Sequence, residues 1–394
     1  MTATFDAPTA EDLVRRARDV VPVLRRHAAW SDENRRLADA SVEAIVDSGL
    51  PRLRVPRRFG GYESDADTLR EVLAELSRGD GAAGWVASVW TIPGWMVGMF
   101  PDAVQEEVWS QPDTRVCGTL SPSGSVTPSG GGYVLDGRWS FVSGALHSQW
   151  QQVVAMGQAP DGTPMPVIGL VPMSELTIVD DWDTSGMRGS GSVTTVAEGV
   201  YVPGERVVPM PVVLEGDPLS EHSASLPLYR APLLGVAALG PAAVMSGLVR
   251  AAWEGFTERI TTRGITYTDY ERQADAPVTH LLAAQVARTN DYVEFHARRI
   301  SGLLDDKGLT GEPWTLDERV RGRADVGAAC ELAAEGIGRI AAASGATSLQ
   351  TSVPVRRLLS DAQAIGLHAL TVPSTAYELY GRVLCGLAPN TAYL

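Results

Sequence analysis

Lysine is nearly absent from this chain of 394 residues, because Lys307 is the only lysine among 33 basic residues. A lysine Schiff base or a phosphate-binding P-loop lysine is therefore poorly supported. Positive charge is scarce as a whole, since 47 acidic residues give a formal net charge of −14. A surface this acidic repels phosphate backbones and anionic lipids, so we expect neither nucleic acid nor a membrane surface as a partner.

Cysteine and histidine are also sparse. The three cysteines, Cys117, Cys330 and Cys385, lie far apart and form no CxxC pair. This spacing offers no disulfide framework and favours a reducing cytoplasm as the location. The six histidines are scattered without an HExxH or similar cluster, so no bound metal is predicted.

Long apolar runs and nucleotide-binding signatures are missing too. The first 16 residues contain acids and no apolar core, so no signal peptide is expected. The uncharged stretch 84–100 is too short to span a bilayer and contains Pro93 and Gly94, so we expect a buried element there. The motifs GxGxxG, GxxxxGKS/T and GxSxG are absent, which excludes a Rossmann-type cofactor turn.

The pattern of apolar residues changes twice along the chain. Apolar residues recur at helical spacing between residues 10 and 110, whereas short alternating strands and glycine-rich turns fill 116–209. Beyond Ala231, four long helical segments are expected near 232–263, 277–304, 316–344 and 354–386. We therefore predict a mostly α, α+β protein with a helical N-terminal domain (1–115), a middle antiparallel β domain (116–212) and a C-terminal four-helix bundle (213–394).

One strand, around residues 136–144, carries an unusual set of side chains. Alternation along a strand places Trp139, Phe141 and Ser143 on one face. An aromatic side chain beside a hydroxyl suits a flat ring with heteroatoms, because the aromatic covers the ring and the hydroxyl binds its edge. Ordinary strand packing explains the same pattern, so the segment alone leaves both interpretations open.

Other candidate residues have the same two interpretations. His368, in a largely apolar segment, is either a core histidine or a general acid/base. Arg263, at the end of the first bundle helix, either binds an anion or lies in solvent. The tryptophans Trp85, Trp90 and Trp95 either belong to the core or wall an apolar aromatic pocket.

In combination, the chain resembles the acyl-CoA dehydrogenase superfamily across nearly its whole length. The domain order is similar, and several motifs fall in register: GTLSPSGS at 118–125 with the flavin-contacting loop TEPxxGS, GRWSFVS at 137–143 with GxKxWIT, and the 182–192 turn with GxRGTxS. The resemblance implies that Ser121 lies in the flavin-contacting loop. It also implies that Phe141 packs on the isoalloxazine ring and that Ser143 bonds flavin N5.

The same resemblance assigns residues in the C-terminal bundle. It places Arg263 and Gly345 at the flavin pyrophosphate, usually that of a neighbouring subunit, and so implies a homotetramer. The dehydrogenases of this superfamily carry a catalytic glutamate about eight residues after an Arg-Asp pair, whereas here Ser360-Asp361 is followed by His368. Without that carboxylate, removal of an α-proton from an acyl thioester has no base.

A histidine at this place resembles the flavin-dependent monooxygenase branch of the superfamily, the oxygenase components of two-component systems. This implies that a separate NAD(P)H:flavin reductase supplies FADH2 or FMNH2, that O2 adds at flavin C4a, and that the resulting hydroperoxide transfers one oxygen atom. We expect His368 and Ser143 to be catalytic, with Ser121, Phe141, Ser143, Arg263 and Gly345 at the cofactor and Trp85, Trp90 and Trp139 at the substrate.

The substrate class follows from a further departure. Several phenol hydroxylases of the branch carry a second histidine about eight residues after the tryptophan that matches Trp85, and this chain has Pro93 there. An electron-rich aromatic or heteroaromatic substrate, such as an indole in specialised metabolism or antibiotic biosynthesis, needs less activation. N-oxygenation of an amine or amino sugar, an acyl-CoA dehydrogenase, and a non-catalytic scaffold stay open as alternatives.

Overall fold

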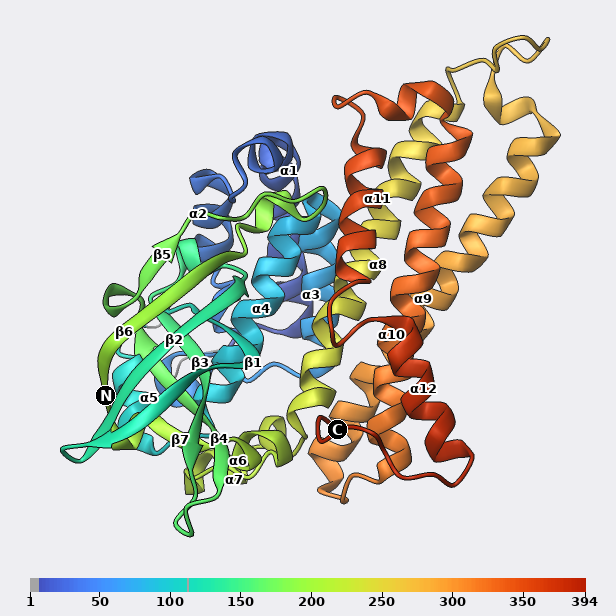
Figure 1. The fold of residues 1–394 in the computed structure, drawn as a ribbon. Helices are drawn as coiled ribbons and strands as arrows, with labels where there is room; N and C mark the ends of the chain where they lie inside the picture. The colour runs from blue at the N-terminus through green and yellow to red at the C-terminus, as the bar shows by residue number, and fades with distance from the viewer. Residues whose placement is uncertain (1–6, 112) are drawn as a thin grey trace.

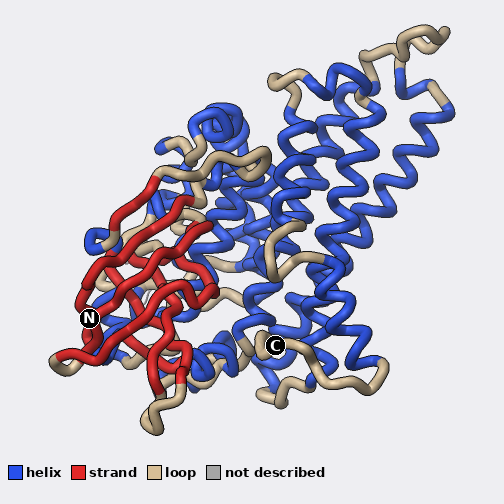
Figure 2. Tube along the Cα trace, in the orientation of Figure 1, coloured by secondary structure: helices blue, strands red, loops and turns tan. Residues whose placement is uncertain are grey.

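The computed structural model describes residues 7–111 and 113–394. Residues 1–6 and residue 112 lie outside the described residues. The first group begins the segment in which no signal peptide is expected, and residue 112 belongs to the range expected for the first domain. Figure 1 shows helices and a twisted sheet on one side of the molecule and a long helical bundle on the other. Figure 2 shows that the strands cluster together and that helices make up the rest of the fold. The expected mostly helical α+β class is confirmed.

The N-terminal part is helical because polar caps separate its apolar segments. Thr9 and Asp12 form a capping box at the start of the first helix. Asp65 and Asp80 accept backbone N–H bonds at the starts of the third and fourth helices. The fourth helix covers the expected buried stretch and runs through Pro93 without ending there. The five helices are α1 (Ala10–Asn34), α2 (Asp39–Asp47), α3 (Ala66–Gly79), α4 (Gly81–Val97) and α5 (Asp102–Val108).

The middle part forms one sheet of seven strands in the order β5-β6-β2-β1-β3-β4-β7. The β domain is confirmed, and its pairs are antiparallel except for β1 and β3, which run parallel, so the sheet is mixed rather than purely antiparallel. The strands are β1 (Val116–Ser129), β2 (Gly132–Val142), β3 (Trp150–Gln158), β4 (Pro164–Pro172), β5 (Thr177–Val179), β6 (Val193–Pro203) and β7 (Val207–Pro209).

The C-terminal part differs from the sequence prediction at one place. The segment expected as one helix over 354–386 is two helices, because the chain turns at 366–372 before Pro373 starts the second helix. A proline at the first helical position disfavours helical backbone in the residue before it. The helices are α6 (Met210–Glu215), α7 (Glu221–Ser225), α8 (Leu233–Ile260), α9 (Pro277–Thr310), α10 (Leu316–Ala343), α11 (Pro354–Ile365) and α12 (Pro373–Leu384).

Helix α8 forms the centre of the molecule. Within the described ranges it is the one helix long and apolar enough to cross a membrane, but 89% of its apolar window is buried inside the protein. Its neighbours α3, α4, α9, α10 and α11 all pack against it. The helix is therefore apolar because protein surrounds it, as in a core helix.

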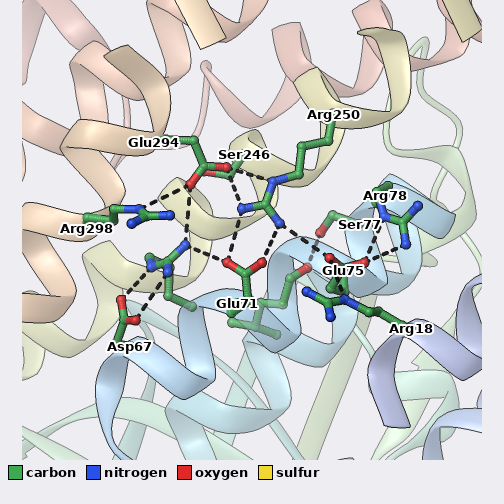
Figure 3. Close-up of polar contacts among 12 residues, drawn as sticks. Arg18, Asp67, Glu71, Glu75, Ser77, Arg78, Ser246, Arg250, Glu294 and Arg298 are labelled. Atoms are coloured by element: carbon green, nitrogen blue, oxygen red, sulfur yellow. Dashed lines mark hydrogen bonds and ion pairs between the residues drawn. The ribbon is translucent and has the colours of Figure 1, made fainter. Parts of the chain in front are cut away.

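An ion-pair network joins the N-terminal helices to the bundle (Figure 3). The guanidinium of Arg250 on α8 lies 2.8 Å from Glu71 on α3 and 2.6 Å from Glu294 on α9. Arg70, which is buried, lies 2.9 Å from Glu71 and 3.4 Å from Glu294. Because the charges on each side compensate one another, three helices meet without leaving an isolated buried charge.

Candidate active site

Three of the predicted residues meet at one point between the N-terminal helices, the sheet and the bundle. Trp85 on α4 donates its indole N–H to Ser143 Oγ at 2.9 Å. Its ring also meets the ring of His368 edge-on, with centroids 5.6 Å apart and planes at 67°. A single tryptophan thus connects the hydroxyl expected at the flavin with the histidine expected to carry protons.

His368 lies in the turn between α11 and α12, and its ring has a defined orientation. The backbone N–H of Leu370 donates to His368 Nδ1 at 3.2 Å, and the hydroxyl of Thr371 donates to the His368 carbonyl at 3.1 Å. An Nδ1 that accepts a hydrogen bond is unprotonated, so the neutral ring carries its proton on Nε2.

The environment of His368 keeps the ring neutral. The side chain retains solvent contact, yet the protein packed around the ring, and then the positive charge of Arg323, lower the pKa of His368 below its ordinary value. At neutral pH the ring is therefore uncharged. It presents an Nε2–H that can be given to a nearby oxygen and recovered.

Ser143 follows the end of β2 and is nearly enclosed. Gly144 turns the chain sharply with φ of +75°, and a side chain at that position would collide with Trp90. Besides Trp85, Ser143 Oγ contacts Ser192 Oγ at 2.6 Å, and Ser192 Oγ contacts Ser190 Oγ at 2.7 Å. Ser190 and Ser192 lie within the 182–192 turn, and their role cannot be predicted from the sequence, because a contact between distant hydroxyls leaves no local pattern.

Phe141 stands out from the surface of the β domain. Its side chain is 69% exposed, its φ is +63°, and the edge of its ring meets Trp182 with centroids 5.9 Å apart. A large aromatic held outward by an uncommon left-handed backbone indicates a surface that packs against something flat.

Trp139 does not share that face, so this part of the prediction is wrong. The pairing of β2 with β6 shifts register between Trp139 and Val142, and this bulge breaks the alternation. The Trp139 ring is fully buried in the core of the β domain and donates to the Val154 carbonyl at 2.9 Å. The structure therefore does not bring Trp139 to Phe141 and Ser143.

The other two candidate tryptophans, Trp90 and Trp95, are buried. Trp90, which is 4% exposed, donates to Ser148 Oγ at 3.0 Å and lies beneath the turn at Gly144. Trp95 is fully buried and donates to the Leu228 carbonyl at 2.8 Å. Trp85 is thus the tryptophan that reaches Ser143 and His368, while Trp90 supports the turn that follows Ser143.

Ser121 lies in an irregular part of β1. The parallel pairing of β1 with β3 shifts between Gly118 and Pro122, and Ser121 is exposed within that irregularity. The hydroxyl of Tyr393 donates to the Leu120 carbonyl at 3.4 Å, so the C-terminal segment reaches this loop (Figure 1). This contact could not be predicted from the sequence, because no local pattern near residue 393 shows which strand the segment contacts.

Arg263 and Gly345 meet at the other end of the bundle. Arg263 Nη2 donates to Thr347 Oγ1 at 2.9 Å and lies 3.9 Å from the position that a Cβ on Gly345 would occupy. Gly345 has φ of +61°. Arg263 Nη1 is buried and has no hydrogen-bond partner in the described part of the chain. A free guanidinium N–H beside an open glycine turn fits a phosphate oxygen.

This second cluster is distant from His368. The twelve residues of α11 lie between the turn that holds Gly345 and the turn that holds His368. At 1.5 Å per residue, that helix alone is about 18 Å long. The cluster expected at the flavin ring and the cluster expected at the pyrophosphate therefore lie at opposite ends of α11.

Two buried carboxyl groups lie behind the site. Asp361 on α11 accepts the Met187 backbone N–H at 2.6 Å, and Asp80 caps α4. Burial, together with the nearby Asp80 carboxyl, raises the pKa of Asp361 to about 7. Burial raises the pKa of Asp80 to about 6. Asp361 holds the 182–192 turn against α11 through this bond.

A metal has no clear place in this arrangement. Across residues 7–111 and 113–394, no three His, Cys, Asp or Glu side chains gather in a way that could hold an ion. All three cysteines are free, and Cys117 and Cys330 are buried. The side chains that meet at Trp85 are an indole, a serine hydroxyl and the His368 imidazole.

Comparison with known proteins agrees with this description. Residues 239–373 match the family model of the acyl-CoA dehydrogenase C-terminal domain. The oxygenase subunit HsaA, a flavin-dependent monooxygenase of Mycobacterium tuberculosis, is 30% identical over 391 residues that cover 97% of each chain. The oxygenase component of an FADH2-dependent resorcinol hydroxylase from a Rhizobium species is 29% identical over 391 residues, 97% of this chain and 96% of that one.

Solved structures include close matches as well. XiaF from a Streptomyces species, solved in complex with FADH2 and glycerol, superposes with a TM-score of 0.92 at 32% identity, covering 98% of each chain. The site residues, the fold and these relatives agree with one another. The chain belongs to the flavin-dependent monooxygenases of the acyl-CoA dehydrogenase fold, as an oxygenase component that uses reduced flavin and O2.

Proposed function

We propose that this oxygenase component hydroxylates an aromatic or heteroaromatic small molecule where Trp85, Ser143 and His368 meet. The observation that carries the proposal is the position of Trp85, which bonds Ser143 and packs on His368 at the same time. Reduced flavin, delivered by a separate reductase, supplies the electrons that activate O2. The protein must orient that flavin, exclude water from it and control one proton.

Each role is assigned to a group whose environment suits it. Phe141 offers an exposed aromatic face for the isoalloxazine ring, and Ser143 offers a nearly buried hydroxyl for flavin N5. His368, neutral with Nε2–H, acts as the acid/base at the reacting oxygen or at the substrate. Trp85 and the aromatic layer behind it reduce access of water to the reacting atoms.

The distant cluster supports a flavin site shared between subunits. Arg263 and Gly345 lie the length of α11 from His368, so we propose that they bind the pyrophosphate of a flavin held by a neighbouring copy. Because FMN has no pyrophosphate, this arrangement favours FAD. The proposed assembly is a homotetramer built on the C-terminal bundle.

The substrate is proposed to be electron-rich and mostly apolar. Helix α4, which carries Trp85, contains no charged residue from Gly81 to Val97. Val89 and Ile92 follow Trp85 on the same helical face and are only partly buried, so they extend an apolar lining beyond the tryptophan. With Pro93 in place of a second histidine, an indole-type ring in specialised metabolism suits the site better than a phenol that requires deprotonation.

The acid/base chemistry of a dehydrogenase has little support here. The two carboxyl groups behind the site, Asp80 and Asp361, are buried, and both accept backbone N–H bonds. Neither replaces the glutamate that acyl thioester oxidation requires, because each is already engaged in the packing of α4 and α11.

The proposal is tested by supplying the protein with a flavin reductase, NADH, FAD or FMN, and a substrate panel under labelled 18O2. We expect one 18O atom to enter an aromatic or heteroaromatic ring, with FAD preferred. An N-oxygenated amine as the sole product would favour the amine oxygenase. Oxidation of an acyl-CoA with an artificial electron acceptor would favour a dehydrogenase, and failure to bind either reduced flavin would favour a scaffold.

A further inference from the structure

Three serine hydroxyls form a buried line that leads away from the site. Ser143, Ser192 and Ser190 are 6%, 5% and 2% exposed. The Ser143 and Ser192 oxygens are 2.6 Å apart, and the Ser192 and Ser190 oxygens are 2.7 Å apart. The line ends where the Ser190 hydroxyl donates to the Met187 carbonyl at 2.7 Å.

The directions of these hydrogen bonds follow from counting protons. Each serine hydroxyl has one hydrogen to donate. When Ser190 gives its hydrogen to the Met187 carbonyl, the shortest of the bonds that this carbonyl accepts, Ser192 is the donor in the contact between Ser192 and Ser190. Ser192 then has no hydrogen left, so Ser143 must donate to Ser192.

The groups at the two ends of the line favour this direction. At one end the Met187 carbonyl can only accept, and it takes the Ser190 hydroxyl at 2.7 Å beside the Ser190 N–H and the Trp182 indole N–H; the Met187 backbone is held by the bond from its N–H to Asp361. At the other end the Trp85 indole N–H can only donate, and it donates to Ser143. Ser143 therefore uses its hydrogen on Ser192 and one lone pair on Trp85, and it retains one lone pair.

We propose that Ser192 and Ser190 are positioning residues that make Ser143 a hydrogen-bond acceptor toward flavin N5, so that the site selects the reduced flavin. This inference rests on the proposed function, which places flavin N5 at Ser143. Reduced flavin carries a hydrogen on N5 and can donate to the free lone pair. Oxidised flavin has only a lone pair on N5, and Ser143 has no hydrogen to offer it.

The experiment is an anaerobic titration with reduced FAD and with oxidised FAD. The variants are Ser192→Ala, Ser190→Ala, Ser192→Thr and Ser143→Ala, and the control is Ser246→Ala. Ser246 is also fully buried, and its hydroxyl donates to the Ala242 carbonyl within α8, away from the serine line. The quantity compared is the ratio of the two dissociation constants, so the readout does not depend on turnover.

Loss of Ser192 frees the Ser143 hydrogen to turn toward oxidised flavin. We expect Ser192→Ala to lower the preference for reduced FAD by about tenfold, the effect of one hydrogen bond of ordinary strength, mainly through tighter binding of oxidised FAD. Ser190→Ala should act in the same direction but less strongly. Ser192→Thr keeps the hydroxyl and should keep the preference, as should Ser246→Ala.

The possible outcomes distinguish a failure of the serine line from a failure of the proposed flavin position at Ser143. An unchanged preference in both Ser192→Ala and Ser190→Ala, with a collapse in Ser143→Ala, would overturn the serine line but leave Ser143 at N5. No change in Ser143→Ala would contradict the proposed placement of the flavin itself. If Ser192→Ala fails to fold, Ser190→Ala gives the same reading, because it also releases the order of the line.

Discussion

At the scale of single residues, the proposed chemistry depends on which protons the side chains carry. His368 accepts a backbone N–H at Nδ1 and is kept neutral by the protein around its ring and by Arg323. In the proposed order of the serine line, the hydrogen of Ser143 points toward Ser192. The proposed site therefore presents one N–H, on His368, and one lone pair, on Ser143.

The lowered pKa of His368 predicts the pH dependence of the reaction. Protonation of Nδ1 would break its bond with the Leu370 N–H, so product formation should fall as the pH drops through the lowered pKa. The folded pKa lies below the unfolded one, so the contribution of neutral His368 to stability is also lost at acid pH. A profile of product formation against pH at saturating substrate should show its acid limb below about 6.5, the ordinary value for histidine. An acid limb above that value would contradict this state of the ring.

At the scale of the elements, Asp361 connects α11 to the turn that carries Ser190 and Ser192. Its pKa is raised by burial and by Asp80 to about 7, so the folded chain holds a proton that the unfolded chain releases near pH 4. Folding therefore binds a proton between these values, and stability falls as the pH rises from about 4 to 7.

Replacement of Asp361 by Asn should remove this loss. The amide oxygen of Asn can still accept the Met187 N–H, so Asp361→Asn should be more stable than the wild type at pH 8, by about 2–4 kcal/mol, and less so at pH 5. Denaturation in urea at the two pH values measures the difference. Asp183→Asn is the matched control, because Asp183 lies in the 182–192 turn that Asp361 contacts, with its side chain 81% exposed. Equal effects of Asp361→Asn at both pH values would show that the Asp361 carboxyl is already ionised at pH 5.

The ion-pair network between α3, α8 and α9 predicts a large effect from one arginine. Arg250→Met leaves Glu71 and Glu294 with Arg70 as a partner but without Arg250, and loss of this partly buried arginine should cost about 1–3 kcal/mol. Arg298→Met is the control, because Arg298 is exposed and lies 3.9 Å from the same Glu294. Chemical denaturation should show a small loss for the control. Equal losses for both variants would mean that the network adds nothing beyond ordinary surface pairs.

The helices and strands, and the side chains they position, could be predicted from the sequence only in part. Helical spacing and caps locate most helices, and family motifs lead to Phe141 and Ser143. The placement of Trp139 failed because the bulge before Val142 reverses the alternation, and a bulge leaves no mark in apolar spacing. The break between α11 and α12 was missed although Pro373 marks it, because the apolar pattern continues across the turn.

Residues that act through tertiary contacts could not be found from the sequence. Ser190 and Ser192 become relevant only when the 182–192 turn packs against the end of β2. Arg323 on α10 donates to the Ala369 carbonyl beside His368, across a separation of 46 residues. Such contacts depend on how the elements pack in three dimensions. That packing cannot be predicted from local sequence patterns.

At the scale of the whole molecule, the separation of Arg263 from Ser143 predicts complementation between subunits. If each flavin uses Ser143 of one copy and Arg263 of another, Arg263→Ala and Ser143→Ala should each impair FAD-dependent product formation. Mixed oligomers of the two variants then contain some sites with neither change, and activity should return on mixing. Light scattering at micromolar concentration should show an oligomer. Complete absence of recovery in verified mixed oligomers would place both residues in one subunit's site.

If His368 is the acid/base of oxygen transfer rather than a packing residue, His368→Ala should separate the two roles. The measurement is the ratio of hydroxylated product to hydrogen peroxide for each reduced flavin oxidised, with the melting temperature recorded alongside. We expect flavin oxidation to continue, product to fall by roughly 10²–10⁴-fold with electrons diverted to peroxide, and the melting temperature to change little. A variant that melts at a lower temperature but still hydroxylates at nearly the wild-type rate below it would show that His368 is a packing residue.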